Sequence, residues 1–95
     1  MDRELVVRAQ GGDRDAFSVL AATSLGRLNA VARLIVRDEQ GAEDAVQDAL
    51  VEAWRSIRGL RNPDRFEAWL HRLLVRACYS HARKGRRPLW SSWPP

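Results

Sequence analysis

Basic and aromatic side chains recur at helical spacing in the last third of the chain. At about 100° per residue they fall within about 80° of one another around a helix. A guanidinium group matches two phosphate oxygens with a forked pair of donors, and a tyrosine ring offers a base a surface to stack on. Few acids lie near this arginine stripe, which favours a nucleic-acid partner over an ordinary solvated face. The arginine stripe consists of Arg65, Arg72, Arg76, Tyr79, Arg83 and Arg87.

An acidic ridge of opposite sign lies in the middle of the chain. Its residues are spaced i, i+3, i+4, i+7 and i+11, so they share one exposed side of a helix. Acids near a helix N-terminus often only complement the helix dipole, so a docking site and a dipole complement both stay open as interpretations. An open surface that includes an amide makes a poor cation cage, and no metal site is predicted. The acidic ridge consists of Asp44, Gln47, Asp48, Val51 and Arg55.

The charges of the 95-residue chain fall into three blocks. Residues 1–37 carry a net charge of +2, residues 38–53 hold six acids and no base, and residues 54–95 hold ten bases and two acids. The overall charge of +4 therefore conceals a block of −6 followed by a block of +8. This distribution predicts a basic partner for the middle of the chain and a polyanion for its last third.

Several function classes are excluded by what the sequence lacks. The single cysteine, Cys78, cannot form an intramolecular disulfide, and there is no Cys/His cluster with zinc-ligand spacing. The N-terminus lacks the apolar run of a signal peptide, and no stretch reaches the length of a membrane span. No serine is accompanied by a base and an orienting group. We therefore expect a cytoplasmic protein that is not an enzyme and uses no cofactor, metal or membrane insertion.

Helical periodicity runs through almost the whole chain. A short first segment stops at Gly11 and Gly12, and Asp13 stands where it can cap a long second helix. A third helix is expected over about residues 41–60. The predicted apolar face of the second helix consists of Phe17, Leu20, Ala21, Leu28, Val31, Ala32 and Ile35.

A fourth helix is expected over about residues 65–84, with a break before it. Either Asn62 caps this helix with proline in its first position, or Asp64 and Glu67 form a capping box. We favour the capping box because it supplies two side-chain acceptors. The predicted core side of this helix consists of Phe66, Trp69, Leu70, Leu73 and Ala77.

The predicted fold is all-α, a compact bundle of three long helices with a short N-terminal helix. Residues 1–87 form this domain, and residues 88–95 are expected to be a linker or a flexible end. Cys78 is expected in or beside the core, and Trp54 either at the core edge or at an interface. The two histidines, His71 and His81, are expected at the surface or boundary and do not form a ligand pair.

The order of four sequence strings is more specific than any one feature. The strings are Arg8-Ala-Gln-Gly-Gly-Asp-Arg-Asp-Ala-Phe17, Ala42-Glu-Asp-Ala-Val-Gln-Asp-Ala49, Ala53-Trp-Arg55 and Phe66-Glu-Ala-Trp-Leu-His-Arg-Leu-Leu74. Over about residues 2–87 the chain resembles the second conserved region of bacterial sigma factors, in the small extracytoplasmic-function group. The resemblance implies a helical domain that docks on the clamp helices of the largest subunit of core RNA polymerase. It also implies that the domain opens the promoter by capturing the non-template strand of the minus-ten element.

The resemblance assigns a partner to each charged surface. Polymerase docking falls on the acidic ridge, and promoter DNA on the loop over residues 58–65 and on the helix that follows it. Many family members have Asn where Arg76 stands and Asp or Asn where Ser80 stands, so phosphate contacts are expected there in place of base readout. The DNA-binding residues that the resemblance implies are Arg58, Arg61, Asn62, Asp64, Arg65, Arg72, Arg76, Tyr79, Ser80 and Arg83.

Family members also carry a second helical domain, region 4, which reads the minus-35 element. The sequence does not supply it, so we expect an excised domain or a truncated product, with an anti-sigma factor as a further partner. One alternative is an interaction module that binds polymerase or an anti-sigma factor without DNA. Another is a helix-turn-helix repressor of duplex DNA, against which the long fourth helix and the loop over residues 58–65 argue.

Overall fold

The computed structural model describes residues 2–85 of the chain. Within that range the chain forms four α-helices and two short 3₁₀ turns, and no strand. The predicted all-α bundle, with three long helices and a short N-terminal one, is confirmed. Arg87, Trp90, Trp93 and the predicted linker over residues 88–95 lie outside the described residues. The elements are α1 (Arg3–Gln10), α2 (Arg14–Ile35), α3 (Glu39–Ser56), η1 (Ile57–Gly59), η2 (Pro63–Arg65) and α4 (Phe66–Gly85).

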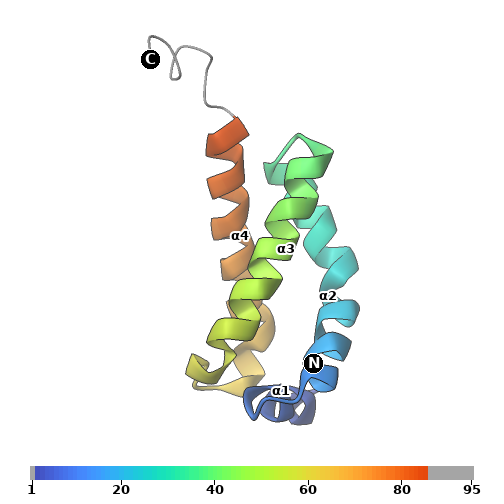
Figure 1. The fold of residues 1–95 in the computed structure, drawn as a ribbon, viewed down its shortest axis with the longest axis vertical. Helices are drawn as coiled ribbons and strands as arrows, with labels where there is room; N and C mark the ends of the chain where they lie inside the picture. The colour runs from blue at the N-terminus through green and yellow to red at the C-terminus, as the bar shows by residue number, and fades with distance from the viewer. Residues whose placement is uncertain (1, 86–95) are drawn as a thin grey trace.

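The three long helices run lengthwise beside one another, and consecutive helices run in opposite directions (Figure 1). The most extensive packing is between α3 and α4, and α2 packs against both. The short α1 lies across one end of the bundle, where it contacts α2 and both 3₁₀ turns of the connection between α3 and α4. Because of this position, α1 can support the loop over residues 58–65, which joins α3 to α4.

Aspartate side chains cap the beginnings of the first three helices. Asp13 accepts a hydrogen bond of 3.1 Å from the backbone N–H of Ala16, which confirms its predicted role at the start of α2. Asp38 accepts one of 2.9 Å from Gly41, so α3 begins two residues earlier than predicted. It also ends earlier, at Ser56, because the chain tightens into a 3₁₀ turn there.

The chain enters α4 through a cap that differs from the one we favoured. The Asn62 side chain accepts a hydrogen bond of 3.0 Å from the backbone N–H of Asp64, with proline at the first position of η2. The predicted capping box is wrong because its two carboxylates bind elsewhere. Asp64 pairs with Arg3 of α1 at 2.9 Å, and Glu67 pairs with Arg27 of α2 at 3.4 Å.

The side of α4 that faces the core is rotated from the predicted one. Trp69, Leu73 and Ala77 pack against the core but are only partly buried. Residues four apart form a ridge that slants around a helix, and helices that cross at an angle pack along such ridges. The fully buried ridge of α4 consists of Phe66, Leu70, Leu74 and Cys78.

A second ridge of the same spacing faces it from α2. The third helix of the bundle, α3, packs against both and buries mainly alanines, whose small side chains permit close packing. Ala21, predicted in the core, is only partly buried. The buried ridge of α2 consists of Ala16, Leu20, Ser24, Leu28 and Ala32. The buried residues of α3 are Ala42, Ala45, Val46, Ala49 and Ala53.

Candidate nucleic-acid interface and acidic ridge

The arginine stripe lies on the outer side of α4. Arg72 stands two positions from both Leu70 and Leu74, which are buried, so it points about 160° to 200° away from the core. Tyr79 is 56% exposed and is one of the few large hydrophobic residues that the described part of the chain leaves open to solvent. The other exposed members of the stripe within α4 are Arg76 and Arg83, and Arg65 is exposed just before the helix.

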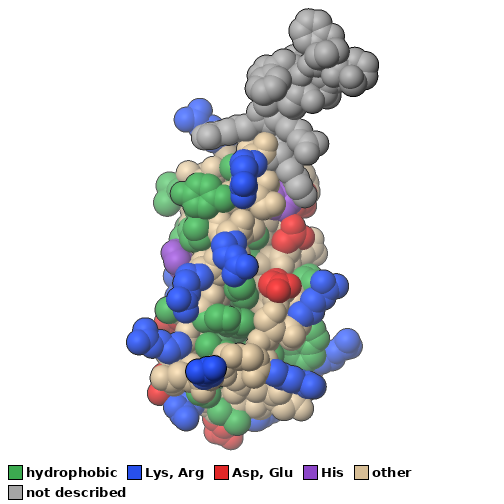
Figure 2. Space-filling view, turned by 90° about the vertical axis from the view of Figure 1, so that its left-hand side faces the viewer, with side chains coloured by type: hydrophobic (Ala, Val, Ile, Leu, Met, Phe, Trp, Pro, Cys, Tyr) green, Lys and Arg blue, Asp and Glu red, His purple; other side chains and the backbone are tan. Residues whose placement is uncertain are grey.

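The face of the molecule that carries α4 is rich in basic side chains. Figure 2 shows this face, with Lys and Arg side chains distributed along its length and hydrophobic side chains between them. Such an array can neutralise several phosphates of one strand while an aromatic ring stacks on a base. The geometry therefore agrees with the nucleic-acid interpretation of the stripe.

The connection between α3 and α4 alternates between buried anchors and exposed polar residues. Burying apolar side chains at regular intervals fixes the backbone, so the residues between them point into solvent at defined positions. The anchors are Ile57, Leu60 and Pro63. The exposed residues are Arg58, Arg61, Asn62, Asp64 and Arg65.

The last residue of α1 holds this connection in place. The Gln10 side-chain amide donates hydrogen bonds of 3.0 Å to the carbonyl of Ile57 and 2.7 Å to that of Leu60. A third contact is the ion pair between Arg3 and Asp64. Sequence reasoning missed these contacts, since they join residues about fifty or sixty positions apart and no local pattern signals them.

Two of the predicted DNA-binding residues of the loop therefore have structural roles. The side-chain amide oxygen of Asn62 caps η2, and the Asp64 carboxylate is paired with Arg3. The outward charge of the loop is carried by its arginines. They are Arg58, Arg61 and Arg65.

The acidic ridge forms one continuous strip along α3. Asp44 is partly buried, and the other four residues are exposed, including Val51 with 46% of its surface accessible. An exposed valine among charged residues offers a partner an apolar contact beside the ionic ones.

Two carboxylates of the ridge are oriented by neighbouring side chains. The Gln40 amide donates a hydrogen bond of 3.0 Å to Asp44 within α3. His81 of α4 lies with its Nε2 atom 2.6 Å from Oδ2 of Asp48. Sequence reasoning placed His81 at the surface or boundary and did not foresee this contact. The one sequence signal for this contact was the position of His81 three residues after Cys78, which places it on the side of α4 that faces α3.

Trp54 and Cys78 serve the core. The Trp54 ring is partly buried and lies 5.2 Å from the ring of Phe17 at an interplanar angle of 60°, which places it at the core edge. Cys78 is completely covered, and this burial raises the pKa of its thiol. A thiol in such a place stays protonated and unreactive at neutral pH.

Residues 2–85 contain no group of three or more His, Cys, Asp or Glu side chains arranged to hold a metal ion. No helix in that range combines the length and apolarity needed to cross a bilayer.

Comparison with known proteins gives consistent matches over this domain. Residues 20–88 match the family model described as Sigma-70 region 2. The chain is 33% identical over 88 residues to the RNA polymerase sigma-H factor of Pseudomonas aeruginosa, covering 92% of this chain and 46% of that protein. It is 36% identical over 85 residues to the ECF RNA polymerase sigma factor SigM of Mycobacterium tuberculosis, covering 90% and 43%. The chain thus spans about half the length of the curated relatives it matches.

The fold is also similar to that of a solved protein. An engineered region 2 of sigmaE, determined by NMR in complex with GTAAAA, superposes with a TM-score of 0.83 and 28% sequence identity. The match covers 94% of this chain and 93% of the other.

Proposed function

The chain belongs to the sigma-70 region 2 family, in the extracytoplasmic-function group of RNA polymerase sigma factors, and on this premise we propose a function with two binding steps. The domain docks on the clamp helices of core RNA polymerase, and it captures the non-template strand of a promoter minus-ten element. Both steps are binding without bond chemistry. The partners are core polymerase, promoter DNA and, in regulation, an anti-sigma factor.

The observation that carries the DNA part of the proposal is the outer side of α4. Its arginines stand opposite the buried ridge, and the same fold occurs in a protein solved in complex with GTAAAA. In this chain Arg72, Arg76 and Arg83 neutralise phosphates of the strand. Tyr79 supplies a ring for stacking, which is worth about 1–3 kcal/mol per base.

The loop between α3 and α4 receives a base that has left the stack. Extrusion of a base costs a few kcal/mol, so the loop must be ordered before the strand arrives if binding is to offset that cost. The two hydrogen bonds from Gln10 and the buried Leu60 supply this order. Arg58, Arg61 and Arg65 then surround the base and its phosphates with positive charge.

The acidic ridge makes the contact with polymerase. Residues 38–53 hold six acids and no base, which suits a basic surface on the partner. Asp48 is the exposed carboxylate at the centre of the ridge, and Val51, one turn later, provides apolar contact. The ridge lies on α3 and the arginine stripe on α4, so the two partners use different helices.

The docking step is tested by binding of the chain to core RNA polymerase. Charge reversal in Asp48→Arg should abolish binding while the circular dichroism spectrum and melting temperature stay near those of the wild type. Asp15→Arg reverses an exposed acid on α2, outside the ridge, and is the matched control. Equal affinity of wild type and Asp48→Arg would remove the docking assignment.

The DNA step is tested by open-complex formation with core polymerase on a promoter bubble, using the non-template sequence GTAAAA and a randomised pool. Arg72→Glu with Arg76→Glu should lower strand binding at least tenfold without loss of polymerase binding. Arg14→Glu with Arg33→Glu, on α2, is the matched control for charge. If the α4 variant bound the strand as wild type does, the protein would instead be an interaction module that does not use DNA.

A further inference from the structure

One direct polar contact joins the acidic ridge to α4. Oδ2 of Asp48 and Nε2 of His81 are 2.6 Å apart. The imidazole is largely covered, with 18% of its side chain exposed, whereas the Asp48 side chain is 65% exposed. One oxygen of the carboxylate is therefore held by a nearly buried ring, while the rest of the group is open to a partner.

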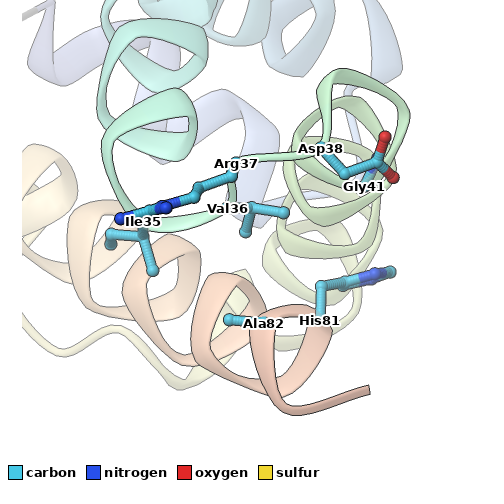
Figure 3. A pocket seen from close by; sticks show the side chains of 7 residues that line it. All are labelled: Ile35, Val36, Arg37, Asp38, Gly41, His81 and Ala82. Atoms are coloured by element: carbon cyan, nitrogen blue, oxygen red, sulfur yellow. The ribbon is translucent and has the colours of Figure 1, made fainter. Parts of the chain in front are cut away.

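His81 stands where the end of α4 meets the connection between α2 and α3. His81 is one of the residues that line a cavity of about 480 Å³ at this end of the bundle (Figure 3). The lining is mixed, with three apolar residues beside two exposed charged ones. The other lining residues are Ile35, Val36, Arg37, Asp38, Gly41 and Ala82.

The charged groups around His81 come from two elements packed against it. From α3 these are Asp48 and, one turn earlier, Asp44, whose carboxylate accepts a hydrogen bond from Gln40. From the connection they are Arg37 and Asp38, and the Asp38 carboxylate caps α3. Asp48 is thus the carboxylate that the imidazole contacts directly.

We propose that His81 is a positioning residue for polymerase docking, which holds the Asp48 carboxylate ready for a basic partner and makes docking sensitive to pH. The inference rests on the proposed docking function of the ridge. A free aspartate side chain on a helix surface samples several rotamers, and ordering it on binding reduces affinity. The imidazole restricts the Asp48 side chain before the partner binds, so less conformational entropy is lost on binding. This corresponds to about a three- to tenfold gain in affinity.

The direction of the pH effect follows from the charge of the pair. A neutral imidazole donates its Nε2 proton and leaves the full negative charge on Asp48. A protonated imidazole cancels that charge, so a basic partner is attracted less. Docking should therefore weaken as the pH falls and the imidazole takes up a proton.

The chain offers a matched pair of variants, because it contains two histidines. His71 is exposed and lies outside the acidic ridge, so His71→Gln is the control for His81→Gln. Binding of each variant of the chain to core RNA polymerase is measured at pH 6 and pH 8. The polymerase's own titrating groups affect all variants equally, so the comparison is between variants at each pH.

Three results are expected. Wild type and His71→Gln lose about three- to tenfold more affinity than His81→Gln between pH 8 and pH 6. At pH 8, His81→Gln binds as wild type, because the glutamine amide can donate to Asp48 from a similar position. At pH 8, His81→Ala binds about three- to tenfold more weakly, with a melting curve that shows the domain still folded.

The opposite results would overturn the inference. If His81→Gln kept the wild-type pH profile and His81→Ala bound with wild-type affinity at pH 8, His81 would have no role in docking. Asp48→Arg separates this failure from failure of the proposed function. Loss of binding by Asp48→Arg alone would preserve the docking function and reject the role of His81, whereas unchanged binding would reject docking itself.

Discussion

The side-chain amide of Gln10 donates a hydrogen bond of 2.7 Å to the backbone carbonyl of Leu60, fifty positions later in the chain. With its second bond, to the carbonyl of Ile57, it ties the end of the first helix to the loop that precedes α4. The shortest helix of the domain therefore orders the loop that we propose to receive a base.

Replacing Gln10 tests this link. In Gln10→Ala two partly buried carbonyls lose their donor, so the free energy of unfolding should fall by about 1–3 kcal/mol in urea denaturation. Strand binding in the open complex should weaken, and docking on polymerase should not. Gln47→Ala removes an exposed amide and should change stability by no more than about 0.5 kcal/mol. Equal stability of both variants would show that the Gln10 bonds contribute nothing.

Replacing each of two glycines with alanine should change the stability of the domain in opposite directions. Gly12 has a φ of +99°, a conformation that side chains rarely adopt, so Gly12→Ala should destabilise the domain by about 1–2 kcal/mol. Gly26 lies inside α2 with open space where a Cβ would be placed. Gly26→Ala should stabilise the domain by about 0.5–1 kcal/mol. Melting temperatures measured by circular dichroism check both, and shifts of the same sign would contradict the backbone argument.

Strand binding should depend on salt. With about three or four phosphate contacts at about 0.7 each, the logarithm of affinity should fall with the logarithm of salt concentration at a slope of about −2 to −3. Arg76→Gln should reduce the slope by about 0.7 because it removes one contact. Arg33→Gln on α2 should leave it unchanged. A salt-independent affinity, measured by fluorescence polarisation, would point to stacking in place of phosphate contacts.

Acid should weaken the junction between α1 and α2. The backbone N–H of Ala16 and then the Arg8 side chain lower the pKa of Asp13 in the folded protein. A lowered folded pKa means that this contribution to stability is present above about pH 4 and is lost as the pH falls through the folded value. Asparagine can still cap a helix but carries no charge.

Asp13→Asn should therefore melt at a lower temperature than wild type at pH 7, and the difference should shrink by pH 3. Asp15→Asn, the neighbouring acid, serves as the comparison, because the Asp15 carboxylate accepts no hydrogen bond in the cap and its backbone N–H is kept in the variant. A difference that grew towards pH 3 would have the wrong sign for a lowered pKa.

The sequence by itself determined the helices and the division of charge. Apolar periodicity, Asp13 as a cap and the break after α3 are local features, and each depends on residues within a few positions of one another. The acidic ridge could be predicted for the same reason, because residues three and four apart on a helix are neighbours whatever the helix packs against. Family membership rests on similar local strings and was confirmed by the matches.

The tertiary structure decided how the helices are rotated and what joins them. Apolar residues lie on two adjacent sides of α4, and either side could have faced the core of the domain. Only the angle at which the helices cross selected the line from Phe66 to Cys78 over one that includes Leu73. The capping choice at Asn62 depended on Arg3 and Arg27, which draw the two carboxylates of the rival capping box to other helices. The contact of His81 with Asp48 likewise requires two helices at a particular rotation and distance, and such contacts leave no trace in local spacing.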